Sequence, residues 1–136
     1  MDDAHVLDVF AGTGAFGLEA LSRGAAHATF VESDRAALAA LTANIAACQT
    51  RDRTTVLPID AIAIPPGDQA NLVFLDPPYR LGLISRAVAR LREVKRLTPG
   101  ALLIAETAHD EPLPVTDVLA ERRFGTARIS IWRAGP

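Results

Sequence analysis

The stretch HVLDVFAGTGAFGLEALSRG, residues 5–24, constrains the fold more than any other part of the chain. Its apolar start predicts a buried strand, and the glycines in its middle break that strand. The chain then continues into a short helix, for which Gly24 is a plausible C-terminal stop. A strand that passes through a tight turn into a helix is typical of proteins in which strands and helices alternate around a parallel sheet.

The same alternation continues along most of the sequence. Further strands are predicted at 28–33, 54–60, 72–76 and 101–106, and helices at 35–48, with Asp34 as N-cap, and 83–97. Residues 119–133 predict two strands joined at 124–126. The sequence therefore predicts one α/β domain over residues 1–136. Its expected fold is a doubly wound, mostly parallel, seven-stranded Rossmann-like sheet with helices on both faces and a C-terminal antiparallel hairpin.

Composition limits the functional class. The formal net charge is −2, which argues against an extended nucleic-acid footprint formed by this chain alone. A single cysteine excludes an internal disulfide, and no apolar run approaches the ~20 residues of a spanning helix. The acidic start does not resemble a secretory leader, and the three histidines are scattered. We expect a cytoplasmic monomer without membrane or metal partners.

In a doubly wound sheet, ligands bind beyond the carboxyl ends of the strands. The positions that end the predicted strands are Asp8 to Gly14, Glu32, Asp60, Asp76 to Tyr79, and Glu106. These are the positions at which a functional site is expected.

The glycine-rich loop predicts a nucleotide-type cofactor. Gly12, Gly14 and Gly17 have the G-x-G-x-x-G spacing, although a tight strand-to-helix turn alone would also explain them. Glu32 follows Gly12 by 20 residues and could accept both ribose hydroxyls of a nucleoside, or could be an ordinary surface acid. A nicotinamide dinucleotide and S-adenosylmethionine both fit these features.

Two further acids favour S-adenosylmethionine. Asp8 ends the first strand, where a carboxylate would repel a pyrophosphate but would suit an ammonium or sulfonium. Asp60 could accept a hydrogen bond from an adenine amino group, and the backbone N–H of Ala61 could donate to the ring. A cap at the end of a strand is an equally good explanation of Asp60.

Three motifs in order, VLDVFAGTGAFGLEALSRGA, FVESD and LVFLDPPY, resemble those of the class I S-adenosylmethionine-dependent methyltransferases. More narrowly, the chain resembles the RsmD-type 16S ribosomal RNA guanine-N2 methyltransferases over residues 5–133. The resemblance implies that the glycine loop, with Gly12, Thr13 and Gly14, holds the cofactor. It also implies a partner that is ribosomal RNA or a small-subunit assembly particle.

The resemblance also implies roles for the four residues that end the fourth strand. Asp76 and the carbonyl of Pro77 would accept hydrogen bonds from an exocyclic amine, Pro78 would stiffen the loop, and Tyr79 would stack on a flipped base. A proline-rich turn after a core strand is the non-functional explanation of the same residues.

Other interpretations stay open. Members of the family usually carry a basic N-terminal segment before the first strand, and this chain starts at that strand. Either the chain is a truncated form or fragment, or substrate binding is lost or delegated. An inactive, cofactor-binding regulatory domain is therefore one alternative. A DNA adenine-N6 or cytosine-N4 methyltransferase is another, although no target-recognition insertion is visible. An NAD-dependent oxidoreductase fits less well, because of Asp8 and the DPPY motif.

Overall fold

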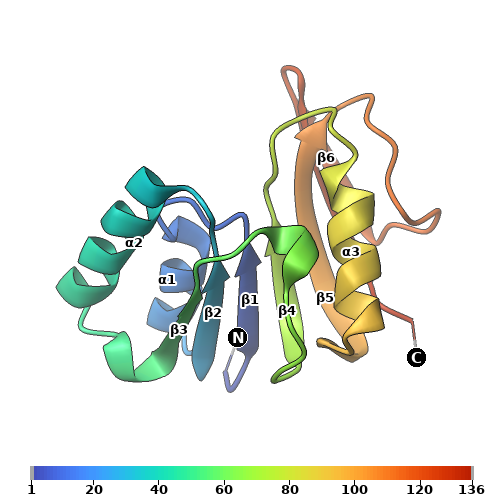
Figure 1. The fold of residues 1–136 in the computed structure, drawn as a ribbon. Coiled ribbons are helices and arrows are strands. Elements are labelled where there is room, and N and C mark those ends of the chain that lie inside the picture. Colours follow the sequence, from blue (N-terminus) through green and yellow to red (C-terminus); the bar gives the residue numbers. More distant parts are fainter. Residues whose placement is uncertain (1, 136) are drawn as a thin grey trace.

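The computed structural model describes residues 2–135, which form one seven-stranded sheet in the order β3-β2-β1-β4-β5-β7-β6 (Figure 1). Strands β1 to β5 run parallel, whereas β7 is antiparallel to both β5 and β6. The strands are β1 (His5–Val9), β2 (His27–Val31), β3 (Thr54–Leu57), β4 (Ala70–Leu75), β5 (Leu97–Ala108), β6 (Ala120–Phe124) and β7 (Ala127–Arg133). The predicted sheet, with its closing hairpin, is confirmed.

Helices cover both faces of this sheet, as predicted. They are α1 (Ala15–Ser22), α2 (Arg35–Ala47) and α3 (Leu83–Glu93), with short 3₁₀ turns η1 (Arg51–Arg53) and η2 (Ala61–Ala63). On one face, α1 and α2 bury Leu21 and Leu41 against Phe30 of β2. On the other, α3 and η2 pack over β4 and β5, where Leu91 and Trp132 are fully buried (Figure 1). Burial of these apolar side chains is the main stabilising contribution to the fold.

Two boundaries differ from the sequence prediction by the largest margin, four residues each. Helix α3 ends at Glu93 instead of continuing to Leu97, because Lys95 adopts a left-handed conformation (φ 59°) that stops the helix. Strand β5 begins at Leu97 instead of Ala101, and its pairing with β4 shifts register between Ala70 and Leu72. Gly100, with φ 73°, lies within this irregular segment, so the predicted stop is instead a bulge inside a longer strand.

Strands β1 and β4 lie side by side at the centre of the sheet, although more than 60 residues separate them. Val9 pairs with Leu75, so both strands end at the same height. The chain order changes direction here, since β2 and β3 lie beyond β1 while β5 lies beyond β4. This is the topological switch point at which open α/β sheets bind ligands.

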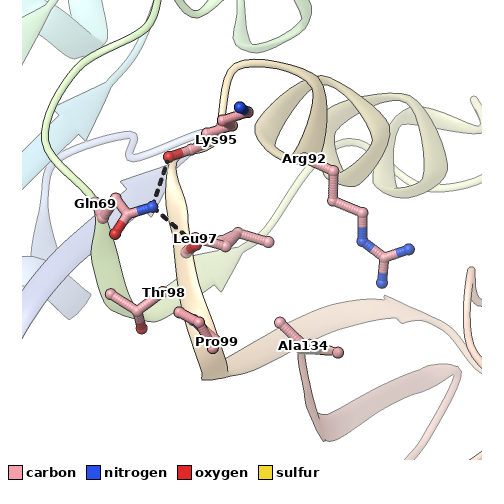
Figure 2. Close-up of a pocket in the computed structure, with 8 residues that line it drawn as sticks. Gln69, Arg92, Lys95, Leu97, Thr98, Pro99 and Ala134 are labelled. Carbon is pink, nitrogen blue, oxygen red and sulfur yellow. Dashed lines mark hydrogen bonds between the residues drawn. The ribbon is translucent and has the colours of Figure 1, made fainter.

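A pocket also lies at the opposite edge of the sheet, near the amino ends of β4 and β5 (Figure 2). Gln69 forms one wall by donating hydrogen bonds to the carbonyls of Lys95 (3.2 Å) and Leu97 (3.4 Å). Because it is separated from the glycine loop by the length of the strands, this pocket is not part of the predicted site. Among residues 2–135, no helix is long and apolar enough to cross a membrane.

Candidate functional site at the carboxyl edge of the sheet

The glycine loop between β1 and α1 is held by backbone hydrogen bonds. Ala11 N donates to the Val31 carbonyl (2.9 Å), and Gly14 N donates back to Ala11 (2.9 Å). From α2, the side-chain amide of Asn44 donates to the Thr13 carbonyl (2.9 Å). The loop is therefore fixed from β2 on one side and from α2 on the other. No local pattern points to Asn44, because its partner is a backbone atom 31 residues away.

The three glycines of the loop have different physical reasons to be glycine. A Cβ on Gly14 would overlap Leu41, and one on Gly17 would overlap the ring of Phe30, so Gly14 lets α2 approach the loop and Gly17 lets α1 pack closely on β2. Gly12 has a positive φ of 58°, and a Cβ there would have no neighbour within 4 Å. Gly12 thus exposes backbone to open space, which is what close approach of a ligand requires.

Glu32 faces this exposed backbone. Its Oε1 accepts from Gly12 N (2.7 Å), and its Oε2 accepts from the backbone N–H groups of Ser33 (3.2 Å) and Asp34 (3.0 Å). A carboxylate offers about four acceptor positions, so three are used and Oε1 keeps one. One ribose hydroxyl could bind there directly, whereas a second would have to replace Gly12 N–H.

Asp8 lies beneath the glycine loop and is only 1% exposed. Its Oδ2 accepts from the backbone N–H of Gly17 in the first turn of α1 (3.0 Å). Burial raises the pKa of Asp8 to about 7; the bond from Gly17 opposes this, while the charges of Asp76 and Glu32 add to it. A cation bound at this edge would stabilise the charged form of Asp8.

Asp60 and Ala61 lie after β3, where η2 begins. The Asp60 side chain caps this turn by accepting from Ile62 N (3.1 Å), while the residue itself is exposed. Ala61 is buried. The cap explanation of Asp60 is thus confirmed, and its second carboxylate oxygen makes no hydrogen bond to the described residues.

The Asp76–Tyr79 segment lies at the end of β4, beside the end of β1. Asp76 N donates to the Val9 carbonyl (3.4 Å), which ties the segment to the strand that leads into the glycine loop. Pro77 is buried, whereas Asp76, Pro78 and Tyr79 are exposed. Partial burial, followed by the charge of Glu106 and a hydrogen bond to it, raises the pKa of Asp76 to about 6.

The loop after the prolines is attached to β5 and to the turn that follows it. Tyr79 donates its hydroxyl to Glu106 Oε2 (3.2 Å), and Arg80 N donates to buried Glu111 (2.8 Å). Arg80 also pairs with Asp110 (2.9 Å). Glu106 was predicted to end the fifth strand, but it lies within β5, which continues to Ala108. Glu111 was not predicted, because it lies outside any motif.

The site thus combines an open glycine backbone, the adjacent carboxylate of Glu32, the buried acid Asp8, and an exposed Asp-Pro-Pro-Tyr segment. The charges of Asp8, Glu32, Glu106 and Asp76 make this edge acidic. It suits a ligand that carries positive charge and a second ligand that offers N–H donors. Within residues 2–135 there is no group of three or more metal-ligating side chains.

The strand order, together with the glycine loop after β1 and a carboxylate after β2, defines the Rossmann-like fold of methyltransferases. The chain belongs to the family described as "Conserved hypothetical protein 95", whose model matches residues 1–133. The resemblance to RsmD-type proteins is confirmed by the relatives below.

Relatives of known name support this placement. The chain is 40% identical over 114 residues to "Ribosomal RNA small subunit methyltransferase D" of Escherichia coli K12, covering 82% of this chain and 57% of that protein. It is 37% identical over 138 residues to the protein of the same name from Haemophilus influenzae, covering 96% and 72%. The chain therefore spans little more than half the length of the Escherichia coli relative.

A crystal structure of a Haemophilus influenzae protein superposes with a TM-score of 0.89 at 30% identity, covering 98% of this chain and 88% of the other. An Escherichia coli structure gives the same TM-score at 34% identity, covering 98% and 77%. Agreement over nearly the whole chain shows that the arrangement of strands and loops is that of its relatives.

Proposed function

We propose that this chain is the core of a methyltransferase that transfers a methyl group from S-adenosylmethionine to an exocyclic amine, guanine N2, of small-subunit ribosomal RNA. The observation that carries the proposal is the position of Asp76–Tyr79 beside the glycine loop. Two neighbouring strands thereby bring a cofactor-type loop and an amine-type acceptor to one edge of the sheet.

The described residues fit S-adenosylmethionine. Gly12 offers unobstructed backbone, and Glu32 keeps a free acceptor position next to it for a ribose hydroxyl. Asp8 would stabilise the ammonium or sulfonium, and Asp60 with Ala61 N–H would bind the adenine edge. Thr13 and Gly14 complete the loop around the methionine part. When bound, the cofactor supplies an electrophilic methyl group on a sulfonium.

The remaining chemistry belongs to the residues after β4. The lone pair of a guanine amine is delocalised into the ring, so the amine is a poor nucleophile. Asp76 and the Pro77 carbonyl can accept its two hydrogens, which orients the lone pair and stabilises the positive charge that develops on nitrogen. Tyr79, 37% exposed, offers a ring face for the extruded base. Most of the rate would come from this placement at near-attack distance.

The substrate class rests on the relatives, two of which are named as methyltransferases of small-subunit ribosomal RNA. With a net charge of −2, this chain has little general attraction for phosphate backbones. Free RNA and an assembly particle are therefore both tested as substrates. The test must distinguish this function from two alternatives: methylation of an amine in DNA, and a purely regulatory role without methyl transfer.

The test is transfer of a labelled methyl group to three substrates. These are free 16S RNA, small-subunit assembly particles from Escherichia coli cells that lack the related methyltransferase, and duplex DNA. Asp76→Ala should reduce transfer at least ~100-fold while leaving cofactor binding within about twofold. Asp52→Ala is the matched control, because Asp52 is an exposed acid of η1 near the opposite edge of the sheet.

Each result has a defined meaning. Labelled N2-methylguanine in RNA or particles supports the proposal. Transfer to DNA alone favours the DNA methyltransferase, and calorimetric binding of S-adenosylmethionine without transfer to any substrate favours the regulatory domain. No cofactor binding would refute all three.

A further inference from the structure

The Glu106 carboxylate connects the two groups to which the proposed function assigns the substrate. Glu106 follows Ala105 of β5, which pairs with Leu75 of β4, so Glu106 stands directly beside Asp76. Its Oε2 accepts the hydroxyl proton of Tyr79 (3.2 Å). No motif contains Glu106, since 30 residues separate it from Asp76 in the sequence.

We infer that Glu106 is a positioning residue of this site, which holds Tyr79 through its hydroxyl and acts on Asp76 as a neighbouring carboxylate. The effect of Glu106 on catalysis rests on the proposed function, whereas its effect on the position and ionisation of Tyr79 does not. A tyrosine that is 37% exposed would otherwise adopt several rotamers, and the hydrogen bond to Glu106 within β5 favours the one that brings its hydroxyl to this carboxylate.

The effect on Asp76 concerns its protonation. When the N–C bond forms and the S–C bond breaks, the sulfonium becomes a neutral thioether, and the amine nitrogen must release one proton. Asp76 is the nearest proposed acceptor of that proton. A second carboxylate beside it makes proton uptake more favourable, because two negative charges in contact repel each other. Partial burial and the Glu106 charge together raise the pKa of Asp76 to about 6.

Other charged groups act on the same region. Asp8 faces Asp76 from β1, and Glu111 acts on Tyr79 from the turn after β5. Ile129 of β7 pairs with Glu106 on one side and with Arg122 of β6 on the other, so Arg122 is in register with Glu106 across β7. The pKa of the Tyr79 phenol is raised, mainly by desolvation and next by Glu106. The charges of Asp76 and Glu111 add to this effect.

The experiment uses the fact that Tyr79 is the only tyrosine in the chain, so its ionisation is measured without interference by ultraviolet absorbance at alkaline pH. Glu106→Gln removes the charge but keeps the size, and should lower the midpoint of Tyr79 ionisation. Glu106→Asp keeps the charge and shortens the side chain, so its midpoint should lie between those of the other two proteins. Glu121→Gln is the control, since Glu121 is exposed on β6 and alternates to the opposite face of the sheet from Arg122.

The catalytic readout separates positioning from general destabilisation. Glu106→Gln should lower kcat about 10- to 100-fold with little change in the cofactor KM, because a misplaced acceptor affects the transition state and not cofactor binding. The acidic limb of its kcat profile, near pH 6 in the unmodified protein, should move to lower pH. Glu106→Asp should recover part of the rate.

The inference is overturned if Tyr79 of the Glu106→Gln variant ionises at the same midpoint as in the unmodified protein. If only the Glu106→Asp variant folds, an unchanged midpoint in that variant overturns the inference. A kcat profile that keeps its acidic limb would also overturn the effect on Asp76. The absorbance titration needs no substrate, so it remains decisive even if the unmodified chain transfers no methyl group and the proposed function fails.

Discussion

The buried acid Asp8 gives the sharpest physical prediction. It is 1% exposed, and burial raises its pKa from 3.8 to about 7, so the folded protein keeps a proton that the unfolded chain releases above about pH 4. The contribution of Asp8 to stability therefore falls as the pH rises between about 4 and 7. Since each pKa unit corresponds to about 1.4 kcal/mol, the contribution of this one group amounts to about 4 kcal/mol.

The substitution Asp8→Asn removes this penalty. An amide has nearly the same shape, and its oxygen can still accept from the Gly17 N–H, but it never has to carry a charge in the core. The difference in unfolding free energy between the variant and the unmodified protein should be near zero at pH 4. It should grow in favour of the variant to about 4 kcal/mol by pH 8.

Urea unfolding at four or five pH values measures this difference directly. The single tryptophan, Trp132, is fully buried and so provides the fluorescence signal. Asp52→Asn, at an exposed position, should show no such pH dependence. A constant free-energy difference between the Asp8→Asn variant and the unmodified protein across this range would refute the argument, because it would mean that Asp8 ionises normally in the folded state.

Three further outcomes are expected from the same site. Gly17→Ala should destabilise the protein by about 1–3 kcal/mol in thermal or urea unfolding, because its Cβ would overlap Phe30. Gly12→Ala should instead weaken cofactor binding, and should cost only about 1 kcal/mol of stability. Equal effects of the two substitutions on stability and binding would contradict this division. Glu32→Gln should weaken cofactor binding about tenfold in calorimetry, since the hydrogen bond from a ribose hydroxyl would lose its charged acceptor. Cofactor binding near pH 6.5 should release a proton as Asp8 becomes charged, which calorimetry in two buffers of different ionisation enthalpy detects and Asp8→Asn abolishes.

Much of the fold was predictable because its signals are local. Apolar runs, a glycine loop and the Asp34 cap each depend on neighbouring residues, and the cap is present in the structure at 2.9 Å from Ala37 N. The end of α3 and the start of β5 were misplaced for the opposite reason. A left-handed Lys95 and a bulge near Gly100 depend on how the connection must turn to pair with β4.

For the site, the sequence by itself determined which acids and prolines lie at or near the ends of apolar runs, since such residues are visible without a structure. Only the tertiary structure decided which of these ends meet. Pairing of β1 with β4 brings Asp8 near Asp76, and pairing of β4 with β5 brings Glu106 to the same place. Burial, neighbouring charge and the Tyr79 hydrogen bond all follow from these pairings, and they depend on distances in space that no local pattern encodes.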